Sequence, residues 1–120
     1  MSGNQKLGKT GEETALRYLE RKGYACLGRN VRVGHDELDL VMRDGAVTVF
    51  VEVKLRKNDA YGRGAEAVDG RKQEKLRTSA QLYLMEHPTN LQPRFDVVEV
   101  YAPQGRDTLR PIVRRTENAF

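Results

Sequence analysis

The chain has 120 residues, of which 38% are hydrophobic and 32% charged, and it carries a formal net charge of +4. This length suits one domain with a modest core, and the apolar content excludes wholesale disorder. The longest apolar run, residues 47–53, is interrupted by Thr48 and Glu52 and falls far short of the roughly 20 residues of a membrane span. We therefore expect a single soluble domain over residues 1–120, with a terminal edge segment at about 103–120 and no membrane partner.

The N-terminal residues and the cysteine content bear on the cellular compartment. The start of the chain has no apolar run of signal-peptide length, which predicts cytoplasmic localisation. Cys26 is the single cysteine, so it has no disulfide partner within the chain, and one thiolate is too few for a zinc site. A reducing compartment fits both observations.

The excess of positive charge is confined to the middle of the sequence. Residues 54–77 contain eight Lys or Arg side chains and four Asp or Glu side chains, whereas the segments before and after them are neutral. Such a run is usually a solvated loop and helix surface. Beside a site, however, it would form a path for an anionic partner.

A first helix is predicted at about residues 11–22. Thr10 and Glu13 have the spacing of a capping box, in which each side chain bonds a backbone N–H of the first turn. An apolar stripe at helical spacing ends at Leu19, and Gly23 supplies the left-handed residue that commonly ends a helix.

Most of the remaining elements are predicted to be strands. The predicted strands lie at about 24–33, 37–43, 47–56, 94–101 and 109–114. A second helix is predicted at about 71–86, a glycine-bearing loop at 58–70 and a turn at 103–107. Asp44-Gly45 separates the second strand from the third and is a strong hairpin signal.

This hairpin places acidic side chains together on one face. With a two-residue loop at Asp44-Gly45, Asp39 comes opposite Phe50. Glu37 comes opposite Glu52 in the same register. A three- or five-residue loop would instead move Asp39 to the other face. That other face is wholly apolar and must be buried against a helix; it carries Leu38, Leu40, Met42, Val47, Val49, Val51, Val53 and Leu55.

Three carboxylates on one face require compensation. Like charges opposite one another destabilise a ladder, so Glu37, Asp39 and Glu52 need either a proton or a cation between them. Lys54 lies on the same face, but Mg²⁺ is the more natural partner of clustered oxygen ligands. The pattern therefore predicts a metal site. The alternative is a solvent-facing set of cross-strand ion pairs, which Phe50 on the same face argues against.

Asp39 followed by Glu52-Val53-Lys54 after a short hairpin resembles the D…(D/E)xK signature of the restriction-endonuclease-like nucleases. The chain is also similar, over nearly its whole length, to the YraN family of small bacterial proteins, which resemble archaeal Holliday-junction resolvases. The matching motifs are Gly8-x-x-Gly11-Glu12-x-x-Ala15-x-x-Tyr18-Leu19, Gly23-Tyr24, Asn30-x-Arg32, Glu37-Leu38-Asp39-Leu40-Val41, Val49-Phe50-Val51-Glu52-Val53-Lys54-x-Arg56, Tyr61-Gly62, Lys72-x-x-Lys75-Leu76, Arg94-Phe95-Asp96-Val97-Val98 and Asn118-Ala119-Phe120. Asp36 and Leu55 stand where the family usually has Gly and Thr, and neither departure removes a predicted ligand.

The resemblance implies an α/β restriction-endonuclease-like fold with three layers, a mixed central sheet flanked by helices in the order αβββαβ. It also implies hydrolysis of DNA phosphodiester bonds with Mg²⁺ or Mn²⁺. Asp39 and Glu52 would bind the metal together with the carbonyl of Val53, and Lys54 would hold the attacking water or the phosphate. Glu12, on the inward stripe of the first helix, would lie beside the metal. From spacing alone, Glu12 fits a favourable interaction with the helix N-terminus equally well.

The same resemblance and the charged middle segment indicate DNA as the partner, with branched DNA a candidate. The predicted nucleic-acid contacts are Arg56, Lys57, Arg63, Arg71, Lys72, Gln73 and Lys75. For Lys72 and Gln73 the alternative is ordinary solvation at a helix start. A homodimer is expected from the resemblance, since a junction has two strands to cut, and Glu37 is left open as a further ligand.

Two other classes of function remain open. One is a non-catalytic nucleic-acid-binding module with a vestigial site, for which binding would be sensitive to salt but not to metal. The other is a structural domain that uses its acidic face to dock a protein, for which no nucleic-acid affinity is expected even at low salt.

Overall fold

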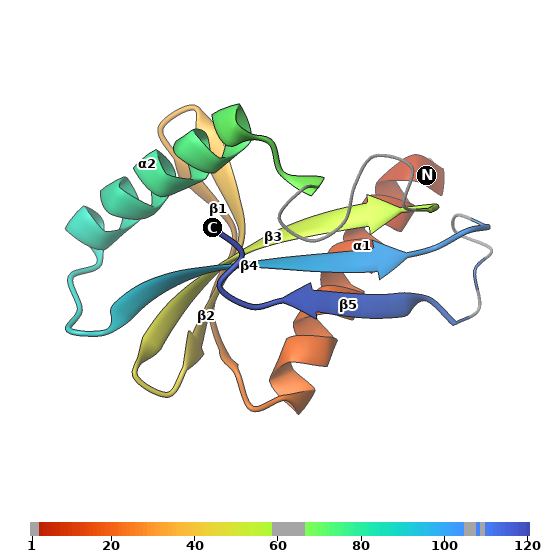
Figure 1. Ribbon diagram of the computed structural model, residues 1–120, viewed down its shortest axis with the longest axis horizontal. Coiled ribbons are helices and arrows are strands. Elements are labelled where there is room, and N and C mark those ends of the chain that lie inside the picture. Colours follow the sequence, from red (N-terminus) through yellow and green to blue (C-terminus); the bar gives the residue numbers. More distant parts are fainter. Residues whose placement is uncertain (1–2, 59–66, 105–107, 109) are drawn as a thin grey trace.

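The fold was analysed in a computed structural model that describes residues 3–58, 67–104, 108 and 110–120, with the side chains of residues 3–10 outside the description (Figure 1). The elements in chain order are α1 (Gly3–Arg21), β1 (Ala25–Val33), β2 (Asp36–Asp44), β3 (Val47–Arg56), α2 (Gly70–Glu86), β4 (Gln92–Tyr101) and β5 (Ile112–Thr116). The predicted order αβββαβ, followed by an edge strand, is confirmed. The predicted loop and turn fall largely on residues 59–66 and 105–107, which lie outside the described residues.

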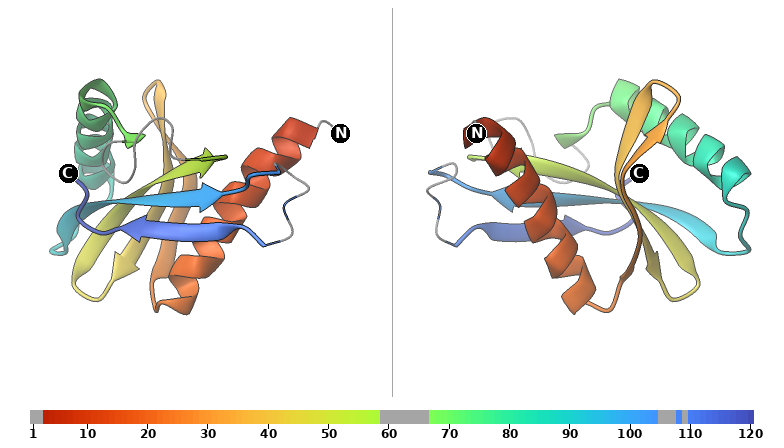
Figure 2. Two further views of the ribbon diagram at one scale, coloured as in Figure 1. Left: turned by 45° about the vertical axis from the view of Figure 1, so that its right-hand side comes forward. Right: turned by 180° about the vertical axis from the view of Figure 1, so that it is seen from behind.

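The described strands form one mixed sheet of five strands in the order β1-β2-β3-β4-β5. Strands β1, β2 and β3 pair antiparallel, β3 and β4 pair parallel, and β5 runs antiparallel to β4. Helix α2 lies in the connection between the parallel strands, while α1 crosses the other face of the sheet (Figures 1 and 2). These three layers confirm the α/β restriction-endonuclease-like fold class.

Each face of the sheet has its own apolar core. The core under α1 contains Ala15, Leu16, Leu19, Tyr24, Leu40, Met42, Val49, Val51, Val98 and Val100. The core under α2 contains Val33, Leu38, Val41, Phe50, Val68, Leu76, Ala80, Tyr83 and Val97. The prediction that one face of the hairpin is buried against a helix is confirmed for most of its residues. It is wrong for Leu38, which packs toward α2 where the β1–β2 hairpin curls alongside that helix, and for Leu55, which is 39% exposed (Figure 2).

Helix α1 starts earlier than the capping pattern indicates. It begins at Gly3, so Thr10 lies inside the helix and the predicted capping box is wrong. Glu13 has other partners, because its carboxylate pairs with Arg29 at 3.1 Å and with Arg17 at 3.6 Å. The predicted end of the helix is confirmed by Gly23, whose φ of +97° is the left-handed conformation that glycine adopts without strain.

The β2–β3 hairpin turns one residue later than its sequence indicates, which shifts the pairing of the two strands by two residues. Asp44 still pairs with Val47, so the two-residue loop is Gly45 and Ala46. Only Gly45 in this loop has a positive φ, +58°, which fits a turn with glycine at its first central position rather than one that starts at Asp44. The predicted pairings of Asp39 with Phe50 and of Glu37 with Glu52 are therefore wrong. A pairing shift of two residues nevertheless leaves Asp39 and Glu52 on one face, as predicted.

Helix α2 confirms the second predicted helix almost to the residue. Asp69 caps it, since its Oδ1 accepts a hydrogen bond of 2.9 Å from the backbone N–H of Lys72. The apolar stripe that the sequence places on this helix is Leu76, Ala80, Tyr83 and Leu84; the first three are buried and Leu84 is partly buried, which holds α2 against the sheet. Neither described helix combines the length and the apolar character that crossing a membrane requires.

Candidate metal centre

Strands β2 and β3 stop pairing where the acidic residues lie. The last pair of their ladder is Leu40 with Val51, and the next residues along the two strands are Asp39 and Glu52. At this point the backbone N–H of Val53 donates to Oδ2 of Asp39 at 2.9 Å instead of to the backbone of β2. Because a strand residue directs its N–H and its C=O to the same side, the carbonyl of Val53 also faces Asp39.

Asp39 and Glu52 form a tight carboxyl pair. Glu52 is 5% exposed, although it is a charged residue on a central strand. Burial raises the pKa of Asp39, and a hydrogen bond with Glu52 and the negative charge of Glu52 also raise it, while the Val53 N–H and the charge of Lys72 lower it; together they bring the pKa of Asp39 to about 7. Two carboxyls held this close are stabilised by a proton or by a nearby cation.

Lys72 reaches this pair from the first turn of α2. Its Nζ lies 3.6 Å from Oε2 of Glu52. The sequence placed Lys72 among the phosphate contacts on the inner side of the second helix and did not predict this ion pair. The available signal was its position one turn before the buried Leu76, which directs the Lys72 side chain toward the sheet.

Glu12 approaches the same pair from α1. Burial raises the pKa of Glu12, and the charges of Asp39 and Glu37 add to that effect, whereas a hydrogen bond with Asn30 lowers it. The structure thus brings Glu12 and Glu37 into the electrostatic neighbourhood of Asp39. Asn30 was not predicted as a site residue, and its φ of +48° in β1 is a conformation that asparagine tolerates better than most residues.

The oxygen atoms of this cluster fit a hard divalent cation. Over the described parts of the chain, no three His, Cys, Asp or Glu side chains are arranged to bind a metal ion together. Asp39 and Glu52 nevertheless supply two carboxylates, and Val53 adds a carbonyl that faces them. Mg²⁺ is typically held in proteins by one or two carboxylates with water completing its octahedral shell. The donor set therefore suits Mg²⁺ or Mn²⁺.

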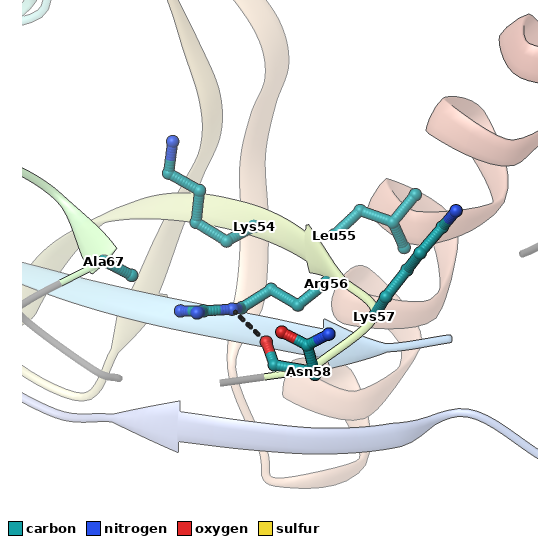
Figure 3. Close-up of a pocket in the computed structure, with 6 residues that line it drawn as sticks. All are labelled: Lys54, Leu55, Arg56, Lys57, Asn58 and Ala67. Carbon is teal, nitrogen blue, oxygen red and sulfur yellow. Dashed lines mark hydrogen bonds between the residues drawn. The ribbon is translucent and has the colours of Figure 1, made fainter. Parts of the chain in front are cut away.

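Lys54 follows the pair along β3 and opens onto a cavity. The cavity has a volume of about 400 Å³ and is lined by Lys54, Leu55, Arg56, Lys57, Asn58 and Ala67 (Figure 3). Figure 3 shows the ammonium of Lys54 projecting away from the hydrogen bond that Arg56 donates to the carbonyl of Asn58. Side chains alternate along a strand, so Lys54 emerges on the same face as Glu52.

Two of the predicted nucleic-acid contacts are engaged inside the protein. Nη1 of Arg56 lies 2.9 Å from Oε2 of Glu99, and the Arg56 side chain is only 8% exposed. Nε2 of Gln73 donates to the carbonyl of Val68 at 2.9 Å. These contacts leave Arg56 little surface for a phosphate and give Gln73 a structural partner next to the helix cap.

The other predicted contacts divide by exposure. Lys57, Arg71 and Lys75 are exposed, with Lys57 at the end of β3 and the other two on α2. Arg63 lies outside the described residues. Exposed cations therefore lie just after β3, the strand that carries Glu52, and on α2, the helix that carries Lys72.

The comparison with known families agrees with the motifs. The model of "Uncharacterised protein family UPF0102" matches residues 11–100. The chain belongs to this family. This confirms the YraN-family resemblance, and the matched UPF0102 range includes Glu12, the carboxyl pair, Lys54 and Lys72.

Individual relatives extend the UPF0102 match to most of the chain. A UPF0102 protein of Symbiobacterium thermophilum is 44% identical over 119 residues, which are 98% of each chain. One from Frankia alni is 49% identical and covers 86% of this chain and 87% of its own. One from Stutzerimonas stutzeri is 46% identical and covers 89% of this chain and 92% of its own.

Proposed function

We propose that this protein is an endonuclease that uses Mg²⁺ or Mn²⁺ to hydrolyse phosphodiester bonds in DNA. The observation that supports this function is the pairing of the partly buried Asp39 with the buried Glu52 at the point where β2 and β3 separate. The pair has a carbonyl beside it, a lysine two residues further along the strand, and exposed cations on the two neighbouring elements.

The side chains have separable tasks in this proposal. Asp39 and Glu52 hold the cation with the carbonyl of Val53, and the N–H of Val53 keeps the Asp39 carboxylate turned toward Glu52. A bound Mg²⁺ would polarise the phosphate and lower the pKa of a water molecule. The ammonium of Lys54 offsets the negative charge that develops on the phosphate or orients the attacking water. Glu12 adds a negative charge near Asp39 from α1.

DNA is the substrate that the surrounding charge favours. Lys57, Arg71 and Lys75 are exposed and can contact successive phosphates without reading bases, so the expected selectivity is for DNA structure rather than sequence. The family resemblance makes branched DNA the first substrate to test. A homodimer and a cytoplasmic location remain predictions that accompany this function.

The test is cleavage of end-labelled linear, flapped and four-way-junction DNA by purified protein with Mg²⁺, Mn²⁺ or EDTA. We expect metal-dependent cleavage that falls at least about 100-fold in Asp39→Ala and in Lys54→Ala, because each removes a group in contact with the reacting atoms. Asp36→Ala and Lys22→Ala change exposed residues of the same charge and serve as matched controls. Equal cleavage by wild type and Asp39→Ala would identify a contaminating nuclease and refute the proposal.

A nucleic-acid-binding module with a vestigial site is the alternative, and one observation favours it. Lys72 already pairs with Glu52, so the acidic pair is partly compensated without a metal ion. This alternative predicts DNA binding in a gel-shift assay that is unaffected by Mg²⁺ and by Glu52→Gln, with no cleavage. A protein-docking domain predicts no shift at low salt, so the same assay distinguishes all three functions.

A further inference from the structure

Lys72 combines a fixed backbone with a side chain that has room to move. Its backbone N–H donates a hydrogen bond of 2.9 Å to Oδ1 of Asp69. The side chain of the next residue, Gln73, donates a hydrogen bond to the carbonyl of Val68. The Lys72 side chain is 42% exposed, yet its ammonium contacts a carboxylate that is almost completely buried. The ammonium therefore covers the outer side of the acidic pair, and it can withdraw toward solvent without any movement of α2.

The charge balance explains why the ammonium rests there. Asp39 and Glu52 are hydrogen-bonded carboxyls in a buried setting, where two adjacent negative charges are strongly unfavourable. Lys54 is closer to Glu52 in sequence, but within the described part of the chain the ion pair to Glu52 comes from Lys72. A lysine ammonium is a compact, mobile charge, suited to a contact that has to be released.

We propose that Lys72 is the counter-ion of the acidic pair in the metal-free protein, and that a divalent cation binds only as the Lys72 ammonium leaves Glu52. This inference rests on the proposed metal site. The carboxylate oxygen that Lys72 approaches is one that a cation needs, and an ammonium held about 4 Å from a divalent ion would repel it strongly. Lys72 is thus a positioning residue that competes with the metal for Glu52.

This competition gives Lys72 a role that differs from that of a phosphate contact. Lys57, Arg71 and Lys75 are exposed cations whose removal should weaken DNA binding and leave metal binding alone. Removal of Lys72 should instead strengthen metal binding, because it abolishes the competitor while both ligands remain. A change in metal affinity therefore separates the role of Lys72 from that of a phosphate contact.

The experiment is titration with Mn²⁺ by calorimetry, without DNA, at pH 8.5 for wild type and three variants. We expect Lys72→Met to bind Mn²⁺ about three- to tenfold more tightly than wild type. Lys72→Arg retains the charge, and Lys75→Met removes the same charge one turn further along α2, so both should stay within about twofold of wild type. In EDTA, Lys72→Met should also melt at a lower temperature than Lys75→Met, because the acidic pair has lost its counter-ion.

Two outcomes would overturn the inference, and they differ in what else they refute. If wild type binds Mn²⁺ and Lys72→Met binds it equally or more weakly, the displacement is wrong while the metal site stands. If wild type and Lys72→Met both fail to bind Mn²⁺, the metal site fails and the displacement fails with it. Tighter binding in Lys72→Met together with tighter binding in Lys75→Met would show a general charge effect and would also refute a specific role for Lys72.

Discussion

Two aspartates of the sheet, one fully buried and one partly buried, show how differently this fold treats negative charge. Asp96 is fully buried and receives Nε of Arg94 at 2.9 Å, Nη2 of Arg94 at 3.0 Å and the N–H of Asn118 at 3.0 Å. Asp39 receives one backbone N–H and faces the carboxyl of Glu52. The first aspartate is surrounded by donors, whereas the second is held against another acid.

The difference separates a carboxylate with a structural role from one that we propose to bind a metal ion. The bidentate pair at Asp96 continues into a network, since Arg94 also lies 2.9 Å from Glu117 and 2.7 Å from the hydroxyl of Tyr24. Such a network joins β4 to the chain segment after β5 and to the segment before β1. At Asp39 the fold instead retains an arrangement that is unfavourable unless a proton, a lysine or a metal ion supplies positive charge, which is the condition expected of a binding site.

The largest expected effect comes from breaking the satisfied network. Arg94→Met leaves Asp96 fully buried without its cation, and loss of one partner of a buried ion pair destabilises a protein by about 3 to 5 kcal/mol. The free energy of unfolding in urea should fall by that amount. The free energy of unfolding of Arg94→Lys should lie between those of wild type and Arg94→Met, because an ammonium does not reproduce the bidentate contact. A loss below about 1 kcal/mol would contradict a structural role for the pair.

The second prediction concerns the pH dependence of stability and its cause at Asp39. The pKa of Asp39 is about 7 in the folded protein, above its unfolded value, so the folded state holds the proton more tightly. The proton on Asp39 contributes most to the free energy of unfolding below the pKa that Asp39 has in the unfolded chain. This contribution falls as the pH rises and is lost above pH 7. In EDTA, the unfolding free energy should therefore decrease by about 2 to 4 kcal/mol between pH 5 and pH 8.5.

Matched aspartate-to-asparagine variants assign this pH dependence. Asp39→Asn removes the titrating group but keeps an oxygen for the N–H of Val53, so its unfolding free energy should vary much less over the same window. Asp96→Asn should lower stability at both pH values, because Arg94 then loses its anion. An unchanged pH slope in Asp39→Asn would assign the titration to another group.

The sequence predicted the faces of the hairpin better than its register. Alternation with a period of two determines which side chains share a face, and the actual pairing shift of two residues leaves that assignment intact except at Leu38, which packs toward α2. Asp39 and Glu52 are therefore brought together as predicted, although the pairings proposed for them are wrong. The residues of the turn do not distinguish a loop at Asp44-Gly45 from one at Gly45-Ala46, because glycine fits either position.

Contacts between distant elements were beyond the reach of local patterns. Arg56 looked like a DNA contact because it lies in a basic segment, but its partner Glu99 is on β4, which becomes its neighbour only through the parallel crossover. The ion pair between Lys72 and Glu52 was not predicted for the same reason, because it forms only through the packing of α2 on the sheet. The early start of α1 at Gly3 was missed because residues 3–10 carry no strong apolar period.

A smaller effect is expected from the hydroxyl of Tyr24, at the edge of the satisfied network. This oxygen accepts hydrogen bonds from Arg94 and Arg115. Tyr24→Phe keeps the ring in the core and removes only the acceptor, so the free energy of unfolding should fall by about 1 to 2 kcal/mol. In Arg94→Met the further effect of Tyr24→Phe should be smaller, since the two residues share one network. Additive losses in the double variant would show that they act independently.

The smallest effect compares two adjacent glutamates that belong to the two kinds of region. Glu13 pairs with Arg29 near the surface, so Glu13→Gln should lower the free energy of unfolding by no more than about 0.5 kcal/mol. Burial and the charges of Asp39 and Glu37 destabilise the ionised form of the Glu12 side chain. Glu12→Gln should therefore leave the free energy of unfolding unchanged or raise it slightly in EDTA at pH 8.5. Urea unfolding of both variants under that condition measures the difference in sign. A loss in Glu12→Gln equal to that in Glu13→Gln would place Glu12 among the ordinary surface acids of α1 and remove it from the acidic cluster.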